Sequence, residues 1–443
     1  MKIQLSDHFS FGRLLRFMLP SIVMMVFTSI YGVVDGIFVS NFAGKTAFSA
    51  VNLIMPYLMV FGAPGFLLGT GGTALISMNL GMGDKKKANE IFSMLTLVCI
   101  VTGLALTGIS MLFLRPVAIL MGAEGQMLHD CVRYGMIVQS ACTAYLLQYA
   151  FQSFCVAAEK PGLSLWMMIV AGVSNIALDA LFIIVFQWGL TGAAVATAIA
   201  QILGALIPLI YFTRPNSSLL RFCRFHFDWK ALWRTCTNGS SELMSNLSMS
   251  LVGMLYNVQL LAYAGQDGIA AYGVIMYVNF VFIAVFIGVV IGAAPVIGFN
   301  YGAANHTELK NVFLKTLAIL GVVALIMTGL AMVLARPLSD VFVGYDATLR
   351  DMTIRGFSVY ALSFLLCGFN IFGSSLFTAL NNGLVSAIIS FVRTLVCQTL
   401  AVWLLPMVFG LDGIWWSIVA AELVALLMTI VFVIAFRKRY HYV

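Results

Sequence analysis

Long apolar runs, separated by short polar interruptions, extend over almost the whole chain. About 20 helical residues are needed to cross the roughly 30 Å hydrocarbon core of a bilayer, and these runs are at least that long. They lack the alternating hydrophobicity that is typical of membrane β-barrel strands. The pattern therefore predicts an all-α membrane protein with twelve spans, at about residues 14–39, 51–78, 91–114, 131–158, 163–187, 190–213, 232–263, 268–299, 312–335, 352–379, 384–409 and 411–436.

The longest polar interruption, residues 214–236, lies at the middle of the chain. Basic residues are mixed with aromatic residues there, among them Arg221, Phe222, Arg224 and Trp229. This composition predicts an amphipathic helix in the membrane interface. A nucleic-acid-binding patch would have a similar composition, but a segment between two spans is poorly placed for it, and we expect no nucleic-acid partner. The predicted division is an N-terminal lobe (1–213), a basic cytoplasmic linker (214–236) and a C-terminal lobe (237–443).

The two halves of the chain align with each other at an offset of 221 residues. Loop glycines and Arg-Pro turns of six successive spans stay in register without a gap, including the pairs Gly81 and Gly302, Arg115 and Arg336, and Gly189 and Gly410. Because six is even, the halves share one orientation and are related by an axis along the membrane normal. Parallel repeats of this kind are one design of secondary transporters, with the substrate site between the halves near mid-membrane.

Composition and charge strengthen this interpretation. Hydrophobic residues make up 61% of the 443 and charged residues 9%, against roughly 25% charged in soluble proteins. Twelve spans use up nearly the whole length, which excludes a large extramembrane catalytic or nucleotide-binding domain. With a cytoplasmic N-terminus, 17 Lys and Arg residues fall in inner segments and 6 in outer ones. The positive-inside rule then predicts a multi-pass protein of the bacterial inner membrane with both termini in the cytoplasm.

Ionisable residues inside the spans are the first candidates for function. Each costs at least ~2.5–3.5 kcal/mol to insert, so each is a functional candidate by default. Apart from residues in the first or last turn of a span, the sequence places five charged residues within the predicted spans: Asp35, Asp179, Glu242, Arg393 and Glu422.

Two of the acids belong to the N-terminal half. At 1.5 Å per residue, the depths of Asp35, Asp179 and Thr197 agree within roughly 5 Å. Asn175 lies one turn from Asp179 on the same helical face. We expect these four residues to share a pocket in the outer half of the lobe. Two carboxylates with Asn and Thr in a low-dielectric pocket suit reversible proton uptake. The same oxygens also suit Na⁺, and a neutral Asp that stabilises helix packing is a third interpretation.

The other three charges, Glu242, Arg393 and Glu422, lie at similar depths near mid-membrane in the C-terminal half. A structural ion pair between Arg393 and one glutamate is one interpretation. The remaining glutamate would then face the central cavity, where it could attract a cationic substrate or carry a second proton. Their counterparts at the 221-residue offset are all uncharged: Ser21, Gly172 and Gln201.

Helix bending and missing motifs narrow the mechanism. Pro20 interrupts the first span 15 residues before Asp35, so it is either a hinge that moves the carboxylate or a permanent kink.

The sequence has no HExxH, GxSxG or DxxxD motif, and a membrane-embedded enzyme would need a nucleophile or metal set that we do not find. The scattered cysteines suggest no metal site. Without an ATPase module, uphill transport must draw on an ion gradient.

Several short motifs resemble the multidrug and toxic compound extrusion (MATE) family, in its bacterial branches. The resemblance covers essentially the whole chain and rests on the order and spacing of the motifs. They are Val34-Asp35-Gly36-Ile37-Phe38-Val39, Gly81-Met82-Gly83-Asp84-Lys85, Asn175-Ile176-Ala177-Leu178-Asp179, Gly192-Ala193-Ala194-Val195-Ala196-Thr197 and Asn300-Tyr301-Gly302-Ala303.

The resemblance implies two six-helix lobes in a V shape, alternating access, and export of cationic amphipathic compounds in exchange for H⁺ or Na⁺. It implies a coupling pocket at Asp35, Asn175, Asp179 and Thr197, with bending of the first helix at Pro20. One departure concerns the tenth span. The branch with a Na⁺ site in the C-terminal lobe has an aspartate there, whereas this span has Asn370 and no acid.

The function expected from the sequence is that of a multidrug antiporter and not an enzyme. Its partners would be cationic drugs or metabolites and membrane lipids, with no cofactor besides the coupling ion, and we expect a monomer. The nearest alternative is a flippase for lipid precursors or polysaccharides, from a related group of exporters. Such flippases usually have extra spans or a cavity rich in arginine, whereas Arg393 is the single intramembrane arginine here.

Overall fold

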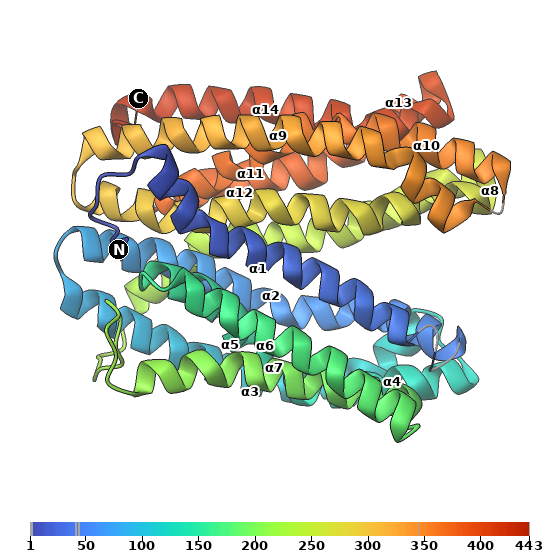
Figure 1. Ribbon diagram of the computed structural model, residues 1–443, viewed down its shortest axis with the longest axis horizontal. Helices are drawn as coiled ribbons and strands as arrows, with labels where there is room; N and C mark the ends of the chain where they lie inside the picture. The colour runs from blue at the N-terminus through green and yellow to red at the C-terminus, as the bar shows by residue number, and fades with distance from the viewer. Residues whose placement is uncertain (1–2, 40–41, 43–44, 345, 443) are drawn as a thin grey trace.

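The computed structural model describes residues 3–39, 42, 45–344 and 346–442. Within those ranges all regular secondary structure is helical, and most helices run along one direction (Figure 1). The elements are α1 (Phe11–Phe38), α2 (Lys45–Gly81), α3 (Lys85–Leu120), α4 (Gly125–Ser140), α5 (Cys142–Ala157), α6 (Pro161–Asp179), the π-helix η2 (Ala180–Val185), α7 (Gly189–Thr213), α8 (Trp229–Gly302), α9 (His306–Val343), α10 (Ala347–Ala361), α11 (Phe364–Ala379), α12 (Gly383–Phe391), the π-helix η3 (Val392–Cys397), α13 (Gln398–Phe409) and α14 (Leu411–Tyr440).

The helices confirm the predicted twelve-span fold. Among the described residues, nine helices are long and apolar enough to cross a membrane, and the pair α10 and α11, bent by 46°, makes a tenth. Helix α8 has 74 residues and breaks at Gly265, whose φ of 63° and ψ of −148° are not helical. It therefore holds both the seventh and the eighth span. Helices α4 and α5, which meet at Ala141, form the fourth span.

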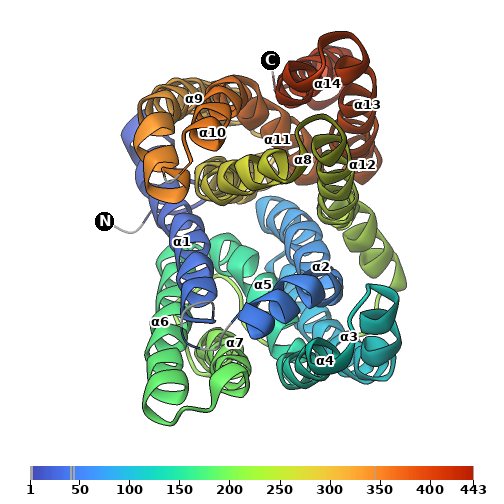
Figure 2. The same cartoon turned by 90° about the vertical axis from the view of Figure 1, so that its right-hand side faces the viewer.

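The two halves of the chain form two lobes in a V shape. In Figure 1, helices α2–α7 lie in the lower lobe and α9–α14 in the upper one, with most of α8 in the upper lobe, while α1 crosses from the upper lobe at the left to the lower lobe at the right. The lobes meet at the end that holds both termini and diverge towards the other end, from which Figure 2 shows them as two separate groups of helices.

Glycines bring the lobes into backbone contact at the end that holds the termini. A Cβ atom at Gly81 of α2 would collide with the carbonyl of Phe299 in α8, and one at Gly302 of α8 would collide with the carbonyl of Met78. Farther along α2, a Cβ at Gly71 would likewise collide with the carbonyl of Thr235. Small residues at membrane helix interfaces permit this close approach.

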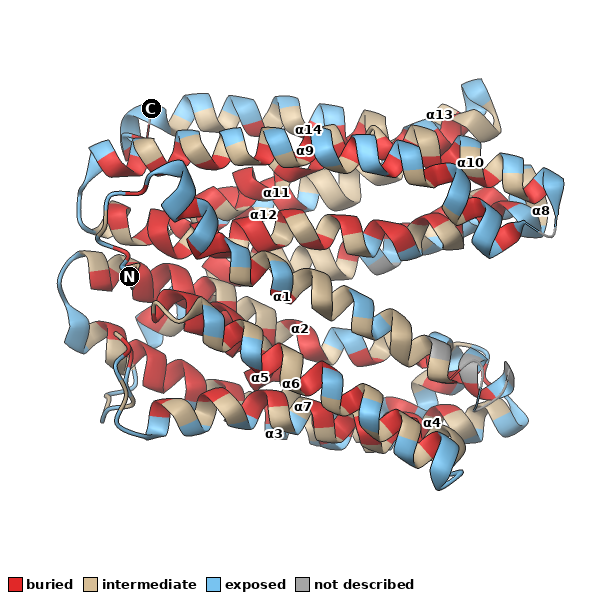
Figure 3. Cartoon of the chain, viewed as in Figure 1, coloured by how far each residue is buried: buried red, intermediate tan, exposed pale blue. Residues whose placement is uncertain are grey.

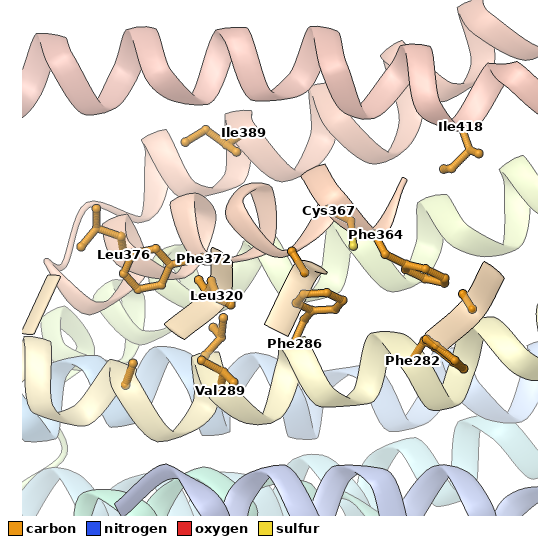
Figure 4. Close-up of a cluster of buried hydrophobic side chains, with 14 of the residues drawn as sticks. Phe282, Phe286, Val289, Leu320, Phe364, Cys367, Phe372, Leu376, Ile389 and Ile418 are labelled. Atoms are coloured by element: carbon orange, nitrogen blue, oxygen red, sulfur yellow. The ribbon is translucent and has the colours of Figure 1, made fainter. Parts of the chain in front are cut away.

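Each lobe has its own apolar core. In the C-terminal lobe, Phe282 stacks on Phe364 with ring centroids 5.2 Å apart, and Gly368 makes room for Phe286 (Figure 4). In the N-terminal lobe, Phe92 packs edge-on against Phe212, at a centroid distance of 5.0 Å. The two cores meet where α1 crosses, because Leu14, Phe17 and Met18 of α1 belong to the core of the C-terminal lobe.

Large apolar side chains also cover the outside of the bundle. Leu112 is 77% exposed and Leu120 is 86% exposed, and Figure 3 shows exposed positions along the outward faces of the helices. An apolar surface of this extent suits contact with lipid rather than water.

The predicted linker helix is not formed. Residues 214–228 have no regular structure, and the helical residues from Trp229 onward belong to α8. Side chains of α3 hold this segment in place: the backbone N–H of Arg221 donates to Asn89 Oδ1 (2.8 Å), and that of Cys223 donates to Ser93 Oγ (3.0 Å). These tertiary hydrogen bonds satisfy backbone groups that a helix would have satisfied internally.

Candidate functional site

A small cavity lies inside the N-terminal lobe, between α1, α5, α6 and α7. Its volume is about 50 Å³. Drug-sized ligands need pockets of roughly 300–1,000 Å³, whereas a few waters or a small cation fit this space. The lining residues include no Lys, Arg or His; they are Tyr31, Asp35, Tyr145, Gln148, Tyr149, Met168, Ala171, Asn175, Thr197, Ala200 and Gln201.

The structure brings together the four residues that the sequence predicts to share a pocket. Asp35 of α1, Asn175 of α6 and Thr197 of α7 line the cavity. Asp179, one turn after Asn175, is 0% exposed, and its carboxyl group is close enough to that of Asp35 for the two to interact electrostatically. Spans one, five and six thus contribute to one site, and its role in coupling stays a prediction.

Local features of α6 position these side chains. Asp179 is its last α-helical residue, and the π-helix η2 follows immediately. π-helical turns are rare and frequent at functional sites. Two turns earlier, Gly172 lets α1 approach, because a Cβ there would lie 2.5 Å from Phe27 Cε1 and 3.0 Å from Tyr31 Cδ1. This close packing brings Asp35 to the end of α6.

The site contains several buried polar atoms without a hydrogen-bond partner in the described part of the chain. Both carboxylate oxygens of Asp179 and Oδ1 of Asp35 accept no hydrogen bond. Asn175 Nδ2, Thr197 Oγ1 and Gln201 Oε1 also have no partner. Most buried polar groups in folded proteins are hydrogen-bonded. Two adjacent carboxylates without donors require a proton or a cation between them, because two like charges repel strongly in a low dielectric.

Helix α5 also contributes to this cavity, which the positions of the intramembrane charges did not predict. Tyr145, Gln148 and Tyr149 line it together, and the Tyr145 and Tyr149 hydroxyls are 3.0 Å apart. Their spacing of three and four residues places them on one face of a helix. This polar stripe in the fourth span is visible in the sequence and could have predicted that α5 faces the site. Tyr31 and Gln201 lie one turn from Asp35 and Thr197, respectively.

The charges of the C-terminal lobe form a closed network. Arg393 Nε donates to both carboxylate oxygens of Glu422 at 3.0 Å, and Arg393 Nη2 lies 2.8 Å from Glu422 Oε1. Asn370 Nδ2 donates to Glu422 Oε2 (2.7 Å), and Asn370 Oδ1 accepts from the Thr429 hydroxyl (3.1 Å). Glu422 is 2% exposed. The predicted ion pair of Arg393 with one glutamate is therefore present, and its partner is Glu422.

Glu242 of α8 stays outside this pair. It is partly buried, and the hydrogen bond that it accepts from Asn246 goes to its backbone carbonyl. Its expected orientation towards a central cavity stays a prediction. Gly172 and Arg393 occupy corresponding positions at the 221-residue offset, and here the lobes differ. Gly172 makes room for α1, whereas Arg393, within η3, supplies a fixed positive charge.

Pro20 lies in the part of α1 that contacts the other lobe. On either side of it, Met18 and Ile22 pack against Gly292 and Gly288 of α8. Farther along, α1 packs against α6 of its own lobe. The helix is continuous from Phe11 to Phe38 in this conformation, and the hinge role of Pro20 stays a prediction.

Comparison with known proteins finds one family. The family model MatE matches the chain twice, at residues 20–181 and 243–404. The two matches are equally long, and each covers most of one predicted half, which agrees with the internal repeat.

Curated relatives and solved structures match over almost the full length. The chain is 26% identical to the multidrug export protein MepA of Staphylococcus haemolyticus over 431 residues, which is 97% of this chain and 94% of the relative. It is similar in fold to a structure described as MATE in the straight conformation, with a TM-score of 0.91 and 21% identity, covering 97% and 98% of the two chains. A multidrug resistance MATE transporter in an outward-facing conformation matches with a TM-score of 0.90 and 22% identity, covering 96% of each chain.

Proposed function

The chain belongs to the MatE family of multidrug efflux transporters, and from this premise we propose that it is a secondary antiporter that exports cationic amphipathic molecules in exchange for H⁺ or Na⁺. It would work by alternating access of the V-shaped cleft between its lobes. We further propose that it acts as a monomer in a bacterial inner membrane with both termini in the cytoplasm. It needs no cofactor besides the coupling ion and catalyses no reaction.

The interaction between Asp35 and Asp179 carries the proposal. Asp35 lines a cavity of about 50 Å³, and the buried Asp179 lies beside it. Among the described residues, no donor reaches Asp35 Oδ1 or either carboxylate oxygen of Asp179. A site of this kind can exchange a proton or a small cation and is too small for a drug. The pocket contains no fixed positive charge that would make the ion unnecessary. Loading and unloading of this site would change the packing of α1, which carries Asp35 and contacts both lobes.

The substrate would bind elsewhere, in the space between the lobes. The partly buried Glu242 is outside the Arg393–Glu422 pair and is the acid available to attract a cationic substrate or a second proton. A pH gradient supplies about 1.36 kcal/mol per unit, and the membrane potential about 2.3 kcal/mol per net charge per 100 mV. One-for-one exchange of monovalent cations uses only the concentration gradient, whereas two coupling ions per substrate would add the potential.

The test is ethidium transport in everted vesicles, with pH and Na⁺ gradients imposed separately. We expect transport to follow one of the two gradients and to be lost in both Asp35→Asn and Asp179→Asn, while the amount of protein in the membrane stays unchanged. Asp267→Asn is the matched control, because Asp267 is exposed in the turn between the seventh and eighth spans. Full gradient-driven transport by both aspartate variants would contradict the assignment of the site.

The arrangement of charges favours this function over that of a flippase for anionic lipid precursors. Such a substrate needs free positive charges in the cavity. Arg393 is the intramembrane arginine, and Glu422 neutralises it at 2.8 Å. Ethidium transport in the assay above is expected of the antiporter and not of the flippase.

A further inference from the structure

A short segment precedes α1 at the end of the bundle that holds both termini. Residues 3–10 form no helix and appear as dark blue coil in Figure 1. Two of their apolar side chains, Leu5 and Phe9, are each 0% exposed. The segment is therefore packed into the protein, and we call residues 3–10 the N-terminal strap.

One end of the strap is bound to the N-terminal lobe. The backbone N–H of Leu5 donates to Glu159 Oε1 at 2.6 Å. Glu159 lies in the turn between α5 and α6 and has a φ of 58°. A positive φ is uncommon for a residue other than glycine, and this turn presents the Glu159 carboxylate to the strap.

The other end of the strap is bound to the C-terminal lobe. The backbone N–H of Phe9 donates to Glu308 Oε1 (2.8 Å), and His8 Nδ1 lies 2.7 Å from Glu308 Oε2. Lys315 Nζ and Asn311 Nδ2 both donate to the Phe9 carbonyl, at 2.6 Å and 3.1 Å. Glu308, Asn311 and Lys315 all belong to α9, in the lobe opposite Glu159. The strap also contacts the start of α1, where Arg13 Nη1 donates to the His8 carbonyl (3.3 Å).

The length of the strap limits how far the lobes can move apart. Four residues separate Leu5 from Phe9, and fully extended chain spans at most about 3.6 Å per residue, or roughly 14 Å in total. The strap is not fully extended, because residues 4–7 form a turn in which the backbone N–H of Asp7 donates to the Gln4 carbonyl (3.1 Å). It can follow the lobes only until this turn has opened. Any further separation of the lobes at this end requires one of the two anchors to release.

We propose that the N-terminal strap is a latch, which holds the lobes together at this end through Glu159 and Glu308 and releases one of them when the transporter changes conformation. This inference rests on the proposed alternating-access cycle. Glu159 and Glu308 are positioning residues here, since neither lies near the ion site or the space for the substrate. The latch stabilises the conformation observed and sets how readily the protein leaves it.

A cysteine at the contact between the lobes can report their separation. Ser77 of α2 is 0% exposed, and a Cβ on Gly298 of α8 would lie 3.2 Å from Ser77 Cβ. We propose Ser77→Cys in a background with Cys223→Ser and Cys236→Ser, because the other native cysteines are buried. The rate of N-ethylmaleimide labelling in proteoliposomes then measures how often the lobes part.

We expect Glu159→Ala and Glu308→Ala each to raise the labelling rate by about tenfold, because hydrogen bonds to charged groups are lost. Combining them should add little, since release of either anchor frees the strap. Glu159→Gln and Glu308→Gln keep an oxygen acceptor and should give smaller increases, which covers the case of poor folding of an alanine variant. Ser6→Ala changes an exposed strap residue and should leave the rate unchanged.

Two results would overturn the latch. The first is an unchanged labelling rate in every anchor variant. The second is a double variant whose increase in rate equals the product of the two single increases, because that result is expected of two independent contacts. Labelling of the parent protein under imposed gradients separates this failure from failure of the proposed function. If gradients change the parent's labelling and the anchor variants do not, the latch alone is wrong. If no protein is labelled under any condition, both the latch and the alternating-access cycle are wrong.

Discussion

The carboxyl groups of Asp35 and Asp179 interact electrostatically inside the N-terminal lobe, and no hydrogen-bond donor in the described chain reaches either oxygen of Asp179. The two residues are 144 positions apart and belong to the first and fifth spans. In water, the solvent would screen the repulsion between two such carboxylates, whereas inside a membrane protein no solvent separates the charges. We therefore propose that this pair is the place where the coupling ion binds and changes the packing of two helices.

Asp179→Asn should stabilise the protein while it abolishes ion-driven export. The amide removes one negative charge and can donate a hydrogen bond to Asp35, so we expect a gain of about 1–3 kcal/mol in the free energy of unfolding. The gain should be largest at high pH without Na⁺, where nothing else neutralises the pair. Thermal unfolding in detergent measures it, with Asp267→Asn as a control that stays unchanged. A lower melting temperature for Asp179→Asn would argue against an unsatisfied carboxylate pair.

Removal of one partner of the ion pair in the C-terminal lobe should be costly. Arg393→Leu leaves Glu422 charged at 2% exposure, and breaking a buried pair in this way costs about 3–5 kcal/mol. Adding Glu422→Leu should restore much of that loss, because apolar residues replace buried pairs with little penalty. Denaturant unfolding of the two single variants and the double variant measures the coupling between them. Additive effects would show that the two charges do not depend on each other.

Gly302→Ala should disturb the contact between the lobes. The new Cβ would collide with the backbone of Met78 in α2, which cannot move aside as a flexible side chain can. We expect a loss of about 1–3 kcal/mol from overpacking, seen as a lower melting temperature. Gly108→Ala is the control, because a Cβ there meets nothing within 4 Å, and removal of a helical glycine should give a gain of about 0.5–1 kcal/mol. If Gly302→Ala and Gly108→Ala changed the melting temperature equally, the contact between Gly302 and Met78 would not be sterically tight.

The linker contributes a stabilisation that depends on pH. The hydrogen bond from Lys87 Nζ, at 2.7 Å, and that from the backbone N–H of Ala231 lower the pKa of Asp228. A lowered folded pKa means that stability is present at neutral pH. It is lost as the pH falls below about 3.9, the usual unfolded value.

Asp228→Asn isolates this effect, because asparagine still caps the start of α8. At pH 7 we expect wild type to exceed Asp228→Asn by about 0.2–1 kcal/mol, the range for exposed pairs. The difference should vanish once the pH is below the lowered pKa of Asp228. Denaturant unfolding of both proteins at several pH values measures it, and a difference that does not change with pH would contradict the ionic contribution.

The sequence by itself determined the spans, the repeat and four residues of the site in the N-terminal lobe. Hydrophobic runs of fixed minimum length report the bilayer thickness directly, so twelve spans could be predicted even where the helices bend, as between α10 and α11. Depth along a helix follows from residue count, which brought Asp35, Asn175, Asp179 and Thr197 to one level. The polar stripe Tyr145, Gln148 and Tyr149 was equally present in the sequence.

Only the tertiary structure decided what depends on the rotation and partners of each helix. The depth of a residue in the membrane does not show which face of its helix points into the lobe. The pairing of Arg393 with Glu422 rather than with Glu242 is therefore known only from the tertiary structure. The linker between the lobes is held by hydrogen bonds to Asn89 and Ser93 of α3, and its composition alone favoured a helix. The position of the strap also could not be predicted from the sequence. Leu5 binds one lobe and Phe9 the other through backbone N–H groups, which every residue except proline has.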